Sequence, residues 1–141
     1  MDRLVIMPLN SPTSIISVFE TRPYWGPELQ RQFPQPTVVI RECRSLADLL
    51  PSIEGFAKSV LLIDLAAGLE ACLEWFTTKS PLRPGSCSII ACGSPETAEL
   101  EWILRDAGVT AFLPDIVPGT TLGRLCRLQL GLTQRRVDRA R

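Results

Sequence analysis

SVLLIDLAAG, residues 59–68, is the stretch that decides the fold of this chain. Four apolar residues, 60–63, run directly into Asp64, and small residues at 66–68 follow as a turn. A continuous β-branched and leucine run is typical of a parallel strand covered on both faces, because a half-exposed strand would alternate apolar and polar residues. In an open α/β sheet, ligands bind beyond the carboxyl ends of such strands. Asp64 therefore stands where a functional site would lie.

The composition predicts one globular domain. The chain has 141 residues, of which 45% are hydrophobic and 21% are charged. This length is enough to bury a core without metals or disulfides. Fifteen basic residues balance fifteen acidic residues, so the net charge gives no global drive toward nucleic acid or an anionic membrane.

Five cysteines bear on metal binding and on the compartment of the protein. They show no C-x-x-C pair, and the chain has no histidine, so we expect no zinc site and no cofactor. Buried free thiols in a reducing cytoplasm are the simpler interpretation, which predicts a cytoplasmic protein. The cysteines are Cys43, Cys72, Cys87, Cys92 and Cys126. An alternative is that Cys92, at a strand end, is reactive.

The two ends of the chain differ from its middle. Residues 1–14 are expected to form an N-terminal arm, since Pro8 interrupts the apolar run Leu4–Leu9, which therefore resembles neither a signal peptide nor a membrane span. Residues 133–141 form a basic tail, with four arginines and one aspartate in 135–141. The tail either contacts an acidic partner or is a solvated terminus.

Between these ends, strand patterns alternate with helix patterns over residues 15–132. Each expected helix carries an apolar stripe at helical spacing, and Ser45 and Ser94 are expected N-caps. Strands are expected at 15–19, 37–43, 60–64, 87–92 and 109–113, and helices at 27–33, 45–53, 69–76, 94–108 and 121–132. This order predicts a three-layer α/β/α sandwich with a five-stranded parallel sheet and right-handed crossovers.

The same order of units resembles the receiver domain of bacterial response regulators. SVLLIDLAAG falls in the third unit, and SIIACGS and LRDAGVTAFLPD fall in the last two. Ala107-Gly108 followed by AFLP is similar to the passage into the fifth strand of that family. The resemblance implies a receiver-like, flavodoxin-like fold. For an active receiver it also implies an acidic pair that holds Mg²⁺ after strand one, an acceptor Asp after strand three, a Ser or Thr after strand four and a Lys after strand five.

Position by position, this set is incomplete. Asp64 stands at the acceptor position, and Ser94 could supply the hydroxyl. Only Glu20 follows the first strand, and a hard cation needs more oxygen ligands than Glu20 and Asp64 supply. Asp115 stands where the family has its Lys, which places a negative charge where a positive one would stabilise an aspartyl phosphate. The sequence thus resembles a degenerate (pseudo-) receiver with a vestigial site.

Several alternatives stay open for these residues. Asp64 could be a strand-end cap, and Ser94 a helix cap rather than an anion site. Tyr24 and Trp25 could line a pocket or cover the sheet. The chain could also be a working phosphoreceiver that uses Asp64 with rearranged metal ligands. A flavodoxin-like enzyme or small-ligand binder that uses Glu20, Asp64 and Ser94 is the third possibility.

Two helices suggest a surface for protein contacts. Trp102 is expected on the far side of the fourth helix, and Leu122, Cys126 and Leu130 form a second apolar row on the fifth. Exposed apolar patches mark contacts, and in receivers this region is the dimer and output face. The sequence predicts a non-catalytic signalling or scaffold domain that forms a homodimer or binds a protein partner, with no membrane or nucleic-acid role. The alternative is that the arm at Leu4–Leu9 covers this row.

Overall fold

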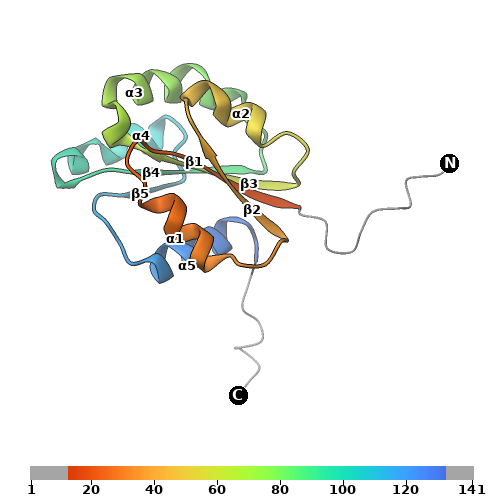
Figure 1. Ribbon diagram of the computed structural model, residues 1–141. Helices are drawn as coiled ribbons and strands as arrows, with labels where there is room; N and C mark the ends of the chain where they lie inside the picture. Colours follow the sequence, from red (N-terminus) through yellow and green to blue (C-terminus); the bar gives the residue numbers. More distant parts are fainter. Residues whose placement is uncertain (1–12, 133–141) are drawn as a thin grey trace.

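A five-stranded parallel sheet forms the centre of the computed structural model, which describes residues 13–132 (Figure 1). Its strands lie in the order β2-β1-β3-β4-β5. They are β1 (Ser14–Phe19), β2 (Val38–Cys43), β3 (Lys58–Asp64), β4 (Cys87–Cys92) and β5 (Ala111–Leu113). The expected parallel sheet is confirmed, and its first strand begins at Ser14, one residue earlier than expected. The expected arm and tail lie outside the described residues, except that Thr13 and Ser14 belong to the start of the domain.

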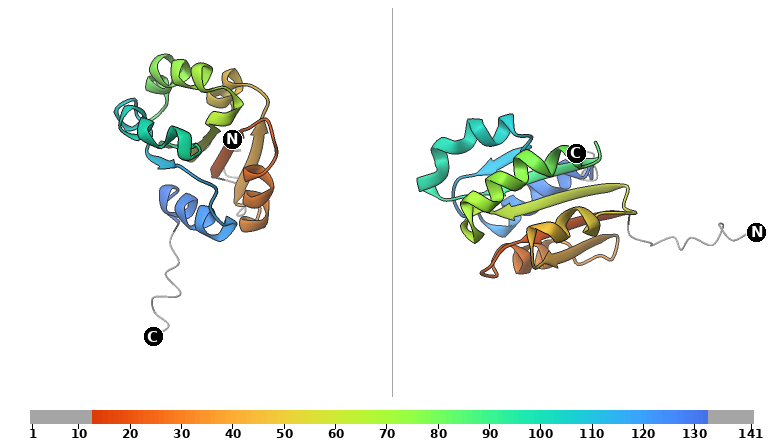
Figure 2. Two further views of the ribbon diagram at one scale, coloured as in Figure 1. Left: turned by 90° about the vertical axis from the view of Figure 1, so that its left-hand side faces the viewer. Right: turned by 90° about the horizontal axis from the view of Figure 1, so that it is seen from above.

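Helices cover both faces of the sheet, which confirms the three-layer sandwich (Figures 1 and 2). On one face lie α1 (Trp25–Gln32) and α5 (Gly119–Gln129). On the other lie α2 (Leu49–Ser52), α3 (Leu69–Thr78) and α4 (Glu101–Asp106). In β3, Leu61 and Ile63 pack toward the second group, whereas Val60 and Leu62 pack toward α1 and α5. The continuous apolar run of this strand exists because both of its faces are buried.

Two of the expected helices begin with tight 3₁₀ turns. The segment expected at 45–53 forms η2 (Leu46–Asp48) and then the short α2, which contains Pro51. A proline has no N–H for the helical ladder, so this helix stays short. Ser45 precedes η2 but makes no side-chain capping hydrogen bond, so the expected cap is wrong in that respect.

The helix expected at 94–108 is likewise divided into η5 (Pro95–Leu100) and α4. The Thr97 hydroxyl accepts a hydrogen bond from the Ser94 N–H at 2.9 Å. At the other end, the φ of Gly108 is +105°, and the Val109 N–H donates to the Leu104 carbonyl at 3.0 Å. Gly108 therefore ends the helix as expected, and Val109 still belongs to the helix end, which is why β5 begins only at Ala111.

Arg83 ties together three segments at the edge where the strands begin. It follows η4 (Ser80–Leu82), and its guanidinium donates to the carbonyls of Ser80, Cys87 and Gly108 at 3.0, 3.0 and 2.9 Å. These bonds join the end of η4, the start of β4 and the α4–β5 turn. No helix within residues 13–132 has the length and apolar character needed to cross a membrane.

Candidate functional site

The carboxyl ends of β1, β3 and β4 bring the sequence-predicted residues to one edge of the sheet. Asp64 lies opposite Cys92, and Phe19 lies opposite Ile63, so Glu20 is level with Asp64. A pocket of about 470 Å³ opens at this edge, here called the strand-end pocket. It is lined by Arg22, Pro23, Tyr24, Trp25, Asp64, Ala66, Gly93, Ser94, Asp115 and Ile116.

Glu20 serves as the N-terminal cap of α1. Its Oε1 accepts the backbone N–H groups of Tyr24 and Trp25 at 3.1 and 3.0 Å, and its Oε2 accepts that of Gly26 at 2.9 Å. The first N–H groups of a helix have no partner within the helix, and a carboxylate there is also favoured by the helix dipole. Both oxygens of the one acidic side chain that directly follows β1 are therefore engaged by backbone.

Asp64 caps the 3₁₀ helix η3 (Leu65–Ala67) that follows it. Its Oδ1 accepts the N–H of Ala66 at 3.0 Å. Burial raises the pKa of this carboxyl, the nearby Glu20 charge raises it further, and the hydrogen bond from Ala66 acts in the opposite direction. The capping interpretation is thus observed, while Asp64 also faces the strand-end pocket.

Ser94, Asp115 and Arg22 complete the charged and polar lining of the pocket. Asp115 is exposed, and its Oδ1 accepts the N–H of Ile116 at 2.8 Å. The structure therefore brings Asp64, Ser94 and Asp115 together as the sequence suggested, and adds Arg22. Glu20 does not line this pocket, because its carboxylate turns to α1.

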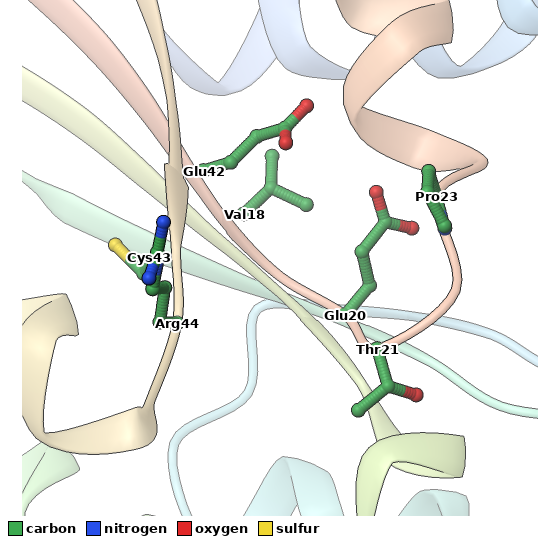
Figure 3. Close-up of a pocket in the computed structure, with 7 residues that line it drawn as sticks. All are labelled: Val18, Glu20, Thr21, Pro23, Glu42, Cys43 and Arg44. Atoms are coloured by element: carbon green, nitrogen blue, oxygen red, sulfur yellow. The ribbon is translucent and has the colours of Figure 1, made fainter.

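Glu42 is a residue that the sequence analysis missed. It lines a second pocket of about 490 Å³ together with Val18, Glu20, Thr21, Pro23, Cys43 and Arg44. Figure 3 shows the carboxylates of Glu20 and Glu42 both directed toward the first turn of α1, with the Cys43 sulfur pointing away from them. Glu42 could have been found from the strand register, since it pairs with Val18 on β1. That inference requires knowing that β2 lies beside β1.

The β1–α1 loop covers the end of the sheet. Trp25 is only 4% exposed and packs edge-on against Tyr24, with the ring centroids 4.8 Å apart. The Tyr24 hydroxyl donates to the Val117 carbonyl at 3.1 Å, which ties this loop to the β5–α5 loop. Tyr24 and Trp25 therefore do both things that the sequence left open: they cover the end of the sheet, and they line the strand-end pocket.

The donor set does not fit the Mg²⁺ that the receiver resemblance implies. Glu20 is occupied by three N–H groups, Asp64 by one, and Asp115 is bonded to Ile116. Among residues 13–132, no group of three or more His, Cys, Asp or Glu side chains is arranged to hold a metal ion. Mg²⁺ requires a nearly ideal octahedron of oxygen ligands, which these engaged carboxylates do not form.

All five cysteines are buried and free, as expected. Burial, and secondarily the Asp64 charge, raises the pKa of the Cys92 thiol well above its ordinary value. Burial also raises the pKa of Cys126 to about 12. Because the thiolate is the reactive form, the proposal that Cys92 is a reactive nucleophile is disfavoured.

The expected contact surface is partly wrong. Leu122, Cys126 and Leu130 are 0, 0 and 2% exposed, so they do not form a surface row. They pack with residues of α1 and of the sheet, because α5 lies against α1. Trp102 is exposed as expected, at 71%.

Comparison with known proteins places the fold. No protein-family model and no curated protein matches the sequence. The structure is similar to that of the pilus assembly protein CpaE from Caulobacter crescentus CB15, with a TM-score of 0.60 and 13% identity over 81% of this chain and 91% of that chain. It is also similar to ShkA Rec1 in complex with c-di-GMP, with a TM-score of 0.54 and 16% identity over 82% of this chain and 91% of that chain. Both are receiver-like folds, and this chain therefore has the response-regulator receiver-like α/β fold.

Proposed function

We propose that this chain is a non-catalytic, cytoplasmic, receiver-like signalling or scaffold domain that acts through protein contacts and is not phosphorylated at Asp64. One observation carries the proposal: both oxygens of Glu20 are committed to the backbone of α1. Phosphoryl transfer depends almost entirely on positioning and on neutralising the charge of the transferred group. With both Glu20 oxygens bonded to the backbone of α1, the site has no free pair of carboxylates to hold the Mg²⁺ that would position and neutralise the transferred group.

The charges around Asp64 support the same conclusion. Glu20 raises the pKa of Asp64, and Asp115 lines the same pocket. A phosphoryl group on Asp64 would add negative charge among carboxylates, with Arg22 as the cation that lines the pocket. We infer that the fold is retained as a platform whose signal is carried by a surface.

The experiment that tests this proposal is a titration with Mg²⁺, followed by the backbone amide resonances of Tyr24, Gly26 and Ala66. These amides bond the two carboxylates, so a metal that competes for either one would move their signals. We expect no saturable change at millimolar Mg²⁺. A saturable change that disappears in Glu20→Gln would contradict the proposal and would support the working phosphoreceiver.

A second candidate function is a small-ligand binder, because the strand-end pocket of about 470 Å³ is large enough for a small molecule. ShkA Rec1 has been solved in complex with c-di-GMP. Asp64 and Asp115 both line this pocket, so any anionic ligand placed there would be repelled by two carboxylates and is disfavoured. A thermal-shift measurement with c-di-GMP tests whether the strand-end pocket binds this ligand. A rise in Tm that grows with c-di-GMP concentration, and whose size differs in Asp115→Asn, would favour this candidate.

A further inference from the structure

Trp102 is an exposed indole on a helix whose core side is already filled. Trp25 and Trp75 are 4 and 5% exposed, whereas Trp102 is 71% exposed. Leu104, on the same helix, is fully buried and anchors α4 to the sheet. The exposure of Trp102 therefore does not result from poor packing of α4, and tryptophan is one of the residues enriched among the energetic hot spots of protein interfaces.

The surroundings of Trp102 are acidic. At helical spacing its neighbours include Glu99 at i−3 and Asp106 at i+4, and both are exposed. Arg105 is held by Glu101 at 2.9 Å and by the Thr110 carbonyl at 3.2 Å. Among residues 13–132, no ion pair involves Glu99 or Asp106.

The acidic character extends from α4 to the exposed side of α3. Four acidic residues and one basic residue lie between Pro95 and Asp106, and α3 adds two exposed glutamates, Glu70 and Glu74. In contrast, α5 on the opposite face of the sheet carries two arginines, Arg124 and Arg127, and no acidic residue. The segment η5–α4 is thus acidic, whereas α5 on the opposite face is basic.

An arginine side chain fits the Trp102 surface better than other groups. The guanidinium stacks on the face of an indole, and its N–H groups also bond carboxylates in a planar, two-pronged geometry. Glu99 and Asp106, three residues before and four residues after Trp102, provide exposed carboxylates at helical spacing from it. This chain itself contains such a segment, since residues 135–141 carry four arginines and one aspartate.

The length of the tail determines which copy it can reach. The described chain ends at Leu132, just after α5, whereas Trp102 lies on α4 on the opposite face (Figure 2). Four further residues, to Arg136, span at most about 14 Å. The route around two helices, each about 10–12 Å across, and the sheet between them exceeds roughly 30 Å. Arg135 and Arg136 therefore cannot reach Trp102 of their own molecule, so the four arginines can contact this surface together only from a second copy.

We propose that the surface formed by Trp102, Glu99 and Asp106 binds the arginine-rich segment 135–141 of a second copy of this chain. This inference rests on the proposed function, in which the protein acts through protein contacts. It adds that the partner is a second copy and that the contact surface is centred on Trp102. The contact is head-to-tail, because the two surfaces that meet are different. It closes into a dimer if both tails are exchanged and forms longer assemblies if they are not.

Sedimentation velocity at low salt tests this proposal with three full-length variants. Wild type should self-associate with rising concentration, and the association should weaken as salt is added. Trp102→Ala should be monomeric, as should a variant with Arg135, Arg136, Arg139 and Arg141 all changed to Gln. Leu128→Ala, which truncates an exposed leucine on α5 (69% exposed), should associate like wild type.

A mixture of the two monomeric variants provides the sharpest test. The Trp102→Ala protein still has its arginines, and the arginine-free protein still has Trp102, so an equimolar mixture should form a one-contact complex. A strictly monomeric wild type, an unaffected Trp102→Ala variant, or a mixture that stays monomeric would each overturn the proposal. The Mg²⁺ titration followed at Tyr24, Gly26 and Ala66 is independent of this contact, so failure here does not imply failure of the proposed function.

Discussion

The Glu20 carboxylate accepts the backbone N–H of Gly26 at 2.9 Å, which fixes the first turn of α1 against the end of β1. Glu20→Ala removes this bond and those to Tyr24 and Trp25. Loss of a helix N-cap lowers the free energy of unfolding by about 0.5–2 kcal/mol. We expect a loss in that range from urea denaturation, with a smaller loss for Glu20→Gln. Glu54→Ala, at an exposed glutamate after α2, should have almost no effect, and equal losses in both proteins would refute the capping role.

Asp64 makes stability depend on pH in an unusual direction. Burial raises its pKa above the ordinary value of 3.8, so the folded state holds the proton more tightly than the unfolded chain. Its contribution to the free energy of unfolding therefore falls as pH rises from 3.8 through the raised pKa. Asp64→Asn keeps an acceptor for the Ala66 N–H and should be more stable than wild type at pH 7, with the gain vanishing below about pH 3.8. A gain that is the same at all pH values would contradict this origin.

Gly93 lies where the end of β4 meets the ring of Phe112. A Cβ at this position would stand 2.9 Å from Phe112 Cε1 and would also collide with the Thr97 hydroxyl. Overpacking of this kind costs about 1–3 kcal/mol. Gly93→Ala should lower the free energy of unfolding by that amount. Gly85→Ala is the matched control, because a Cβ there meets nothing within 4 Å, and it should be neutral or slightly stabilising.

Arg83 should contribute more to the free energy of unfolding than is usual for a loop residue. Arg83→Ala removes three hydrogen bonds to carbonyls that belong to separate segments. Hydrogen bonds from charged donors contribute about 1.5–3 kcal/mol, and we expect a loss of this size in chemical denaturation. Arg31→Ala removes an exposed pair with Glu28 on α1 and should change stability by about 0.5 kcal/mol or less. Similar losses for the two variants would show that the Arg83 bonds contribute little.

The sequence predicts the layers of the fold because hydrophobic periodicity reports burial. The run 60–63 has no polar residue, and the structure covers both of its faces. Helix boundaries are predicted less accurately, because the 3₁₀ turns Leu46–Asp48 and Pro95–Leu100 carry apolar residues at a spacing close to that of an α-helix. The positions of Asp64, Ser94 and Asp115 at one edge follow from parallel strands alone.

The remaining features depend on contacts between distant segments. Leu122 and Cys126 show the same helical spacing whether α5 is covered or exposed, and only the approach of α1 decides that they are buried. A glutamate after the first strand could serve as a metal ligand in an active site or as a helix cap, and the sequence around Glu20 is the same in both cases. The role of Glu20 becomes visible only when the loop 21–24 brings the N–H groups of α1 back to it.

Incubation with acetyl phosphate and Mg²⁺, followed by intact-mass analysis of wild type and Asp64→Asn, tests the central claim most directly. The claim is that Asp64 stands at the end of β3, while residues 13–132 contain no cluster of side chains arranged to hold the cation that a phosphoacceptor needs. We predict no gain in mass for either protein. A phosphate-sized gain in wild type that is missing in Asp64→Asn would contradict the account and would identify the chain as a phosphorylation switch.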